Sequence, residues 1–217
     1  MLPLTPTLAL LLLAGQSLAT PSSPTTTFRS DALNLTYTYP STFKPLPAAA
    51  DNALQSEKDK ATGAVAKAAV SCISLPLTAT DSTSGFRMIS IMRLDGTCLG
   101  RPTTPAELST LATTTLTDSL KRFGDPQLST AASYQPADHP AAVLSGSVVS
   151  ARYGTTFYGT ATCLLQGQDA VCWEFLASKC SALPDLISYP IQFDGQSPQP
   201  LIPAKFAQAC LGAGSSR

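Results

Sequence analysis

The chain has 217 residues, of which 14 are Lys or Arg and 14 are Asp or Glu, so its formal net charge is zero. Only 13% of the residues are charged, 44% are hydrophobic, and a single histidine is present. A balanced and sparsely charged surface has no strong field to attract polyanions, so the composition argues against nucleic-acid binding.

The start of the chain is typical of a secretory signal peptide. Residues 8–14 form an apolar run that is too short to span a bilayer and fits the hydrophobic segment of a signal. Ser17 and Ala19 then place small side chains before the expected cleavage site. We expect a signal at 1–19, a mature chain from Thr20, and a secreted or periplasmic protein without a transmembrane anchor after cleavage. An uncleaved hydrophobic tail is the alternative, because no Lys or Arg precedes the run.

Three regions follow the signal. Residues 20–27 are rich in Pro, Ser and Thr and are expected to be a linker. Residues 28–194 are expected to form a single globular domain, since they carry the strand and helix patterns. Residues 195–217 contain Pro198, Pro200 and Pro203 and are expected to form an extended tail.

The first half of the domain alternates strand and helix patterns. Apolar side chains at every second position from Leu33 to Tyr39 predict a strand. A short polar stretch within 51–61 favours a helix. Residues 70–77 and 86–94 are apolar and β-branched, and the segment 81–85 between them is rich in Ser, Thr and Gly, which predicts a hairpin.

Residues 104–123 give the clearest helix pattern. Thr104 can cap it, Pro105 suits the first helical position, and Glu107 completes a capping box. The residues that follow form one apolar stripe at helical spacing, namely Leu108, Leu111, Leu116, Leu120 and Phe123. Gly124 and Pro126 end the helix.

The second half predicts strands at 141–151, 156–165 and 170–177, a short helix at 181–188 and a last strand at 191–193. On the middle hairpin, Phe157, Ala161, Leu165 and Leu176 share one face, whereas Leu164, Val171, Trp173 and Phe175 share the other. A sheet that is apolar on both faces needs cover on both. The pattern therefore predicts an α+β fold, with an antiparallel sheet covered by helices as an α/β/α sandwich.

Six cysteines in an exported chain predict disulfides. A tight turn at Gly167 and Gln168 would place Cys163 directly opposite Cys172, close enough for a bond; two buried free thiols are the alternative. Sequence proximity pairs the remaining four cysteines as Cys72 with Cys98 and Cys180 with Cys210. No Cys-x-x-Cys motif occurs, and a single histidine leaves no zinc-finger spacing.

The order of the elements resembles the PsbP-like superfamily over about residues 28–194. The resemblance is carried by a leading strand that ends in Tyr39-Pro40-Ser41, a hairpin, a long amphipathic helix, a meander that begins at His139-Pro140-Ala141-Ala142, and a short helix before Ile191-Gln192-Phe193. It implies an α/β/α sandwich and a role in binding or assembly, with no shared catalytic residues. The six cysteines and a segment at 44–69 that resembles an insertion depart from the family.

The sequence shows no pattern typical of a catalytic or metal site. It has no nucleophile elbow and no glycine-rich phosphate loop. His139 lies between Asp138 and Pro140, which favours a solvated turn histidine. Metal binding by Asp138 and His139 together is disfavoured, because adjacent side chains point to different sides of an extended chain. The carboxylates Glu174, Asp169 and Asp185 show no spacing that favours glycoside hydrolysis. We therefore predict no catalytic, cofactor-binding or metal-binding residue.

Two further features allow a structural and a functional interpretation. Trp173 is the only tryptophan, and core packing is favoured over stacking on a ligand. Asn34-Leu35-Thr36 matches an N-glycosylation sequon, which matters only in a eukaryotic secretory pathway.

These observations favour an exported, non-enzymatic binding or assembly module without a cofactor, whose partner is an unknown envelope or extracellular protein. One alternative is a secreted hydrolase with an unrecognised acid/base site, which a pocket with convergent carboxylates would support. Another is a disulfide-stapled, inhibitor-like protein that presents a loop, for instance at 81–85.

Overall fold

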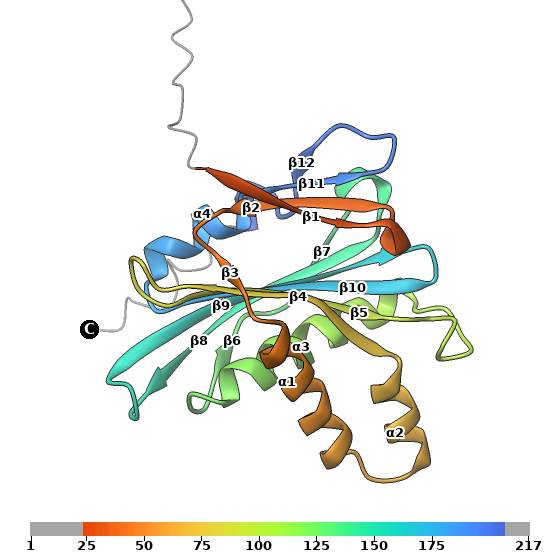
Figure 1. Cartoon of the computed structure of the whole chain (residues 1–217), viewed down its shortest axis with the longest axis horizontal. Helices are drawn as coiled ribbons and strands as arrows, with labels where there is room; N and C mark the ends of the chain where they lie inside the picture. The colour runs from red at the N-terminus through yellow and green to blue at the C-terminus, as the bar shows by residue number, and fades with distance from the viewer. Residues whose placement is uncertain (1–23, 207–217) are drawn as a thin grey trace, which may run out of the picture.

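The computed structural model describes residues 24–206, which fold around two antiparallel sheets (Figure 1). The larger sheet has eight strands in the order β3-β4-β5-β10-β9-β8-β6, and β7 pairs with β8 as well. Their bounds are β3 Lys44–Pro45, β4 Ile73–Asp81, β5 Arg87–Leu94, β6 Gln127–Leu128, β7 Ala132–Tyr134, β8 Ala141–Ser150, β9 Thr155–Gln166 and β10 Asp169–Ala177.

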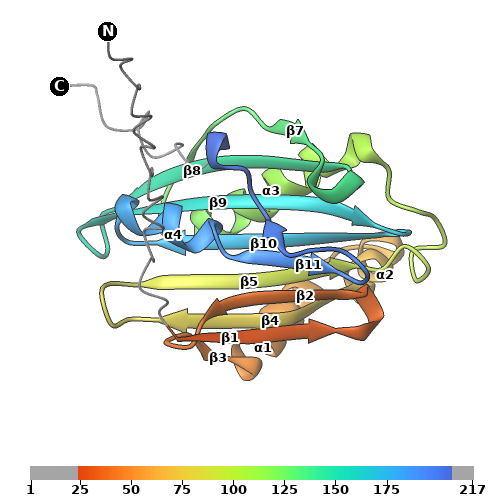
Figure 2. The same ribbon diagram turned by 90° about the horizontal axis from the view of Figure 1, so that it is seen from above.

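The smaller sheet joins the two ends of the described chain. Its order is β1-β2-β11-β12, with bounds β1 Thr25–Ser30, β2 Leu35–Pro40, β11 Pro190–Phe193 and β12 Gln199–Pro200. Figure 2 shows this sheet lying over the large one, above β4, β5 and β10. Its inward side chains, which include Leu35, Tyr37 and Ile191, pack against Trp173 and Phe175 of β10 in one core cluster.

Helix α3 (Leu108–Lys121) covers the opposite face of the large sheet. A single 3-10 turn, Pro105–Glu107, precedes it, and the predicted capping box is present: the Glu107 carboxylate accepts hydrogen bonds from the backbone N–H and the hydroxyl of Thr104 (2.8 and 2.9 Å). Four side chains, Leu108, Ala112, Leu116 and Leu120, are buried at helical spacing. Burial of this stripe is what holds the helix to the sheet.

The mixed α+β class and the antiparallel sheet are confirmed, and so are the two faces predicted for the β9–β10 hairpin. Helical cover on both faces is not confirmed. One face packs against the small sheet and the short helix α4 (Leu183–Ile187), whereas only the other face packs against α3. A second sheet can bury an apolar face as well as a helix can, and the alternation in β10 does not distinguish them.

The folded unit is longer than the predicted domain. Thr25, Thr26 and Thr27 were expected in a linker but belong to β1, which pairs with β2 over its full length. Residues beyond 194 were expected in an extended tail, but β12 pairs with β11, and Leu201 and Ile202 are buried in the core. The expected signal peptide at 1–19 lies outside the described residues.

The segment that resembled an insertion forms β3 and two helices, α1 (Pro47–Lys60) and α2 (Ala64–Ser71). Figure 1 shows both helices below the large sheet, at the side away from β1 and β2. In residues 24–206, no helix is long and apolar enough to cross a membrane.

Candidate functional site

Disulfides hold the large sheet at two places. Cys163 of β9 and Cys172 of β10 lie directly opposite each other and are bonded, in the register that the turn at 167–168 predicts. A second bond, Cys72–Cys98, joins the segments that enter β4 and leave β5, at the base of that hairpin. Cys180 is disulfide-bonded too. Cys210, its expected partner, lies outside the described residues, so this pair stays a prediction.

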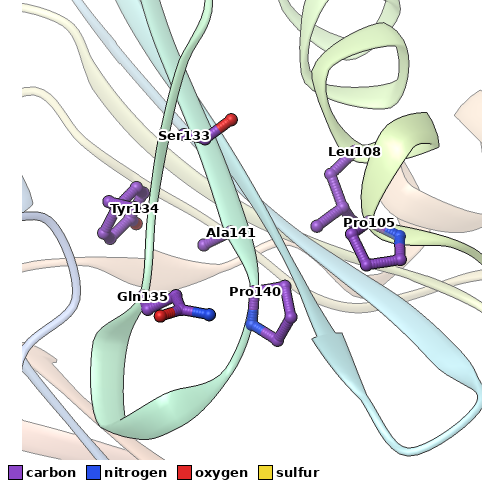
Figure 3. Close-up of a pocket in the computed structure, with 7 residues that line it drawn as sticks. All are labelled: Pro105, Leu108, Ser133, Tyr134, Gln135, Pro140 and Ala141. Atoms are coloured by element: carbon purple, nitrogen blue, oxygen red, sulfur yellow. The ribbon is translucent and has the colours of Figure 1, made fainter.

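A pocket of about 480 Å³ lies between the start of α3 and the strands β7 and β8 (Figure 3). Leu108 and Pro105 line one side, and Ser133, Gln135 and Pro140 line the other. Tyr134 and Ala141 complete the lining. The volume lies within the usual range of small-molecule sites, roughly 300–1,000 Å³.

The lining of this pocket is neutral. Tyr134 carries its only ionisable group, and burial raises the pKa of that phenol. The Tyr134 hydroxyl donates to the Leu201 carbonyl (2.9 Å) and contacts the Thr162 hydroxyl (2.7 Å), so both of its neighbours lie in the core. Apolar side chains, the Ser133 hydroxyl and the Gln135 amide remain to meet a ligand.

His139 holds the loop that connects β7 and β8, the two strands that line one side of the pocket. Its ring stacks on Phe193 with 4.0 Å between centroids, and its Nδ1 is 2.9 Å from the Leu165 carbonyl oxygen. His139 does follow a turn, as expected, but it is not fully solvated, because its half-buried ring contacts Phe193 of the small sheet and Leu165 of the large one. The loop needs such support, since Ala137 and Asp138 both adopt a left-handed backbone conformation (φ 47° and 67°).

Among the described residues, Glu174 is the one carboxylate whose pKa moves to neutrality, and the sequence pattern gave it little weight. It lies in the middle of β10, opposite Ser90 of β5 and Ala161 of β9, and only 5% of it is exposed. Burial raises its pKa to about 7, against a hydrogen bond from Ser119 and the charge of Arg122. No hydrogen-bond partner for its Oε1 is found among the described residues. The alternation of side chains along β10 tells which face of the sheet Glu174 lies on. Its burial depends on α3, which covers that face only in the tertiary structure.

Glu174 and the pocket do not form one site. The pocket touches α3 at Leu108, whereas Glu174 meets the same helix at Ser119, roughly 16 Å further along the axis. Asp169 lies at the start of β10, where it accepts hydrogen bonds from Arg93 and the Gly96 backbone (2.8 and 2.9 Å). Asp185 is exposed on α4. The three carboxylates considered for hydrolysis are therefore dispersed.

The other two residues with a possible functional role, Trp173 and Asn34, lie in the core and in a turn. Trp173 is fully buried beside Tyr37, with 6.2 Å between ring centroids, as expected for core packing. Asn34 is exposed in the turn before β2. Within the described part of the chain, no group of three His, Cys, Asp or Glu residues could hold a metal ion.

Comparison with known proteins shows a weak structural resemblance to the PsbP-like fold. No family model matches the chain, and no curated protein matches it. A cyanobacterial PsbP from Synechocystis is similar with a TM-score of 0.45 and 10% identity, over 78% of this chain and 89% of that one. A Pseudomonas aeruginosa protein described as a putative regulator of unknown function has a TM-score of 0.33 and 11% identity, over 73% and 85%. No residue or role is carried over from either.

Proposed function

We propose that the chain is an exported binding module that holds a small neutral ligand, or a neutral part of a larger partner, in the pocket of Figure 3. The neutral lining supports this most directly. General acid–base and nucleophilic catalysis need an ionisable side chain within reach of the substrate. Here the single ionisable lining group is a phenol that is engaged in the core.

The lining also indicates the kind of ligand. Pro105, Leu108 and Pro140 offer apolar contacts, while Ser133 and Gln135 offer one hydroxyl and one amide. A ligand with an apolar group and a neutral hydrogen-bonding group, such as an amide, fits this combination. A carboxylate or an ammonium group would lose its hydration without gaining a partner of opposite charge.

Two disulfides support an oxidising compartment, which is consistent with export. They do not support the inhibitor-like alternative. The turn at 81–85 is bound to the body of the protein, since Phe86 N–H donates to the Ser178 hydroxyl (3.0 Å) and Thr42 donates to Asp81 (2.9 Å). A loop that enters a protease needs to stand clear of its scaffold.

The test is a fragment screen of the exported protein by thermal shift and NMR, with neutral amides and charged fragments in equal number. Neutral amides should bind, and Ser133→Trp should abolish their binding by filling the pocket. Thr114→Trp, on the exposed face of α3, is the matched control and should leave binding unchanged. Preferential binding of charged fragments, or equal binding to the Ser133 variant, would contradict the proposal. Hydrolysis of a fragment that Ser133→Trp abolishes would replace it with the hydrolase alternative.

A further inference from the structure

The end of β8 and the turn that follows it carry the most exposed large apolar side chains of the described chain. Val149 is 76% exposed and Tyr153 is 53% exposed, and Arg152 lies between them with its guanidinium over the Tyr153 ring (5.3 Å). Figure 1 shows this turn at one end of the large sheet, beside the end of α3. We call residues 149–154 the hairpin tip.

The hairpin tip rests on an aromatic cluster that holds it in place. Tyr153 meets Phe123, which follows α3, and Phe157 of β9 edge-to-face, with ring centroids 6.0 and 5.8 Å apart. Phe123 and Phe157 stack at 4.0 Å, and Phe86 packs beside both. One edge of Tyr153 is thus anchored, while the rest of its ring stays exposed. A rigid exposed ring loses little conformational entropy when a surface covers it.

Four cations around the hairpin tip form no ion pair with a carboxylate of the described residues, although the charge of Arg122 also acts on the buried Glu174. Lys121 and Arg122 directly precede Phe123, Arg152 lies in the tip itself, and Lys179 lies beside Gly85, next to Phe86. None of the ion pairs between residues 24 and 206 includes any of these four. Three exposed carboxylates lie at the same end of the protein, namely Asp118, Asp125 and, on α4, Asp185. The local balance is therefore positive in a chain whose net charge is zero.

The opposite end of the sheet is different. There Arg29 pairs with Asp31, Arg93 with Asp95 and Asp169, and Arg101 with Glu107, at 2.8–3.1 Å. At the hairpin-tip end Arg87 of β5 also pairs with Asp81, so the two ends differ only in the four cations around the tip that belong to none of these ion pairs. The exposed tyrosine and the exposed valine lie at the end that carries these four cations.

We propose that the hairpin tip is a peripheral docking surface for a membrane that contains anionic phospholipids. Tyrosine is favoured at the boundary between headgroups and acyl chains, because its ring is apolar and its hydroxyl is polar. Val149 adds apolar area, and the lysines and arginines around the tip meet the lipid phosphates. The protein would lie on such a membrane by this end, with the pocket directed along the sheet toward the other end. The proposal does not depend on a ligand in the pocket.

The test is co-sedimentation of the exported protein with vesicles of equal parts phosphatidylglycerol and phosphatidylcholine, compared with vesicles of phosphatidylcholine alone. Binding should require the anionic lipid and should fall as salt screens the charges. Lys121→Ser and Arg152→Ser should each weaken binding about fivefold, the contribution of one cation near an anionic surface. Tyr153→Ser should weaken binding as well, whereas Tyr153→Trp should retain it and shift its added fluorescence to the blue on binding.

Lys58→Ser and Lys67→Ser are the matched controls, because both lysines are exposed on α1 and α2 and belong to none of the ion pairs of residues 24–206. They should leave binding unchanged. All variants share the same N-terminal segment, so any contribution of the apolar run at 8–14 to vesicle binding is common to them. Trp173 fluorescence checks that each variant is folded. Equal binding to neutral and anionic vesicles, or equal losses in the control variants, would overturn the proposal. Capture of a protein through the tip without vesicle binding would overturn it too.

Discussion

Replacing Glu174 with glutamine should flatten the pH dependence of the protein's stability. The carboxyl group is buried between β10 and α3, where Ser119 is its hydrogen-bond donor. Asp118 on α3 and Arg122 just after it act on the pKa of Glu174 with opposite signs, and its neighbours on β5 and β9, Ser90 and Ala161, are uncharged. Glutamine has nearly the same shape but cannot ionise.

The magnitude follows from the two pKa values of Glu174. In the unfolded chain it ionises near 4.5, and in the folded protein burial raises its pKa to about 7. Below the lower value both states hold the proton, and above the higher value the folded state has to bury a charge. Unfolding free energy should therefore fall as the pH rises from about 4.5 to about 7. The total loss is about 3 kcal/mol, because a tenfold change in a proton-binding constant corresponds to about 1.4 kcal/mol.

Denaturant unfolding at a series of pH values measures this loss, with Trp173 as the single tryptophan reporter. The difference in unfolding free energy between wild type and Glu174→Gln should change by about 3 kcal/mol between pH 4.5 and 8, and the Gln variant gains relative stability as the pH rises. The glutamine amide is buried without a full set of hydrogen-bond partners, which lowers the unfolding free energy by an amount that does not vary with pH. The test is therefore how the difference in unfolding free energy changes with pH. Glu107→Gln is the control, because hydrogen bonds from Arg101 and Thr104 lower the pKa of Glu107 and its effect should be flat above pH 5. Parallel curves for wild type and Glu174→Gln would refute the argument.

Further expectations follow from other parts of the molecule. The intact mass of the exported protein should correspond to a start at or near Thr20, and a mass that retains residues 1–19 would contradict this. Unreduced peptide maps should recover Cys163 bonded to Cys172, and replacing both with serine should lower the unfolding free energy by roughly 2–3 kcal/mol. His139→Ala should lower it by about 1–3 kcal/mol through the lost hydrogen bond and ring stacking, measured by denaturant unfolding; an unchanged midpoint would contradict the packing role. Gly159→Ala should destabilise the protein, because a Cβ there would lie 2.6 Å from a Leu116 methyl carbon, and an unchanged thermal midpoint would contradict that close approach.

Local features of the fold could be predicted where the chain interacts with its near neighbours. The capping box at Thr104 and Glu107 forms between residues three apart, and its residue types alone specify it. The hairpin register that joins Cys163 and Cys172 follows from a tight turn and strict alternation. In both cases the partner lies within one turn of helix or one hairpin, so no knowledge of distant elements is needed.

The candidate site was less predictable, because its residues meet only in the folded protein. Leu108 of α3 and Ser133 of β7 carry no signal of a shared pocket, and the order of elements does not say which edge of the sheet the helix start reaches. His139 looked like an isolated turn residue, since Phe193 and Leu165 reach it from other strands. Long-range packing of this kind leaves no periodic trace in the sequence.

By itself, the sequence determined the secondary structure of the core, the mixed class, the Cys163–Cys172 pairing and the two apolar faces of β10. Only the tertiary structure decided what covers those faces and what the covering does. Alternation specifies that Trp173 must be buried but not whether a helix or a sheet buries it, so the small sheet replaced the expected helices on one side. On the other side α3 closes over Glu174, and a carboxyl group that would ionise near 4.5 in water keeps its proton to about 7. Dehydration of a side chain depends on everything that surrounds it, and that is a property of the fold.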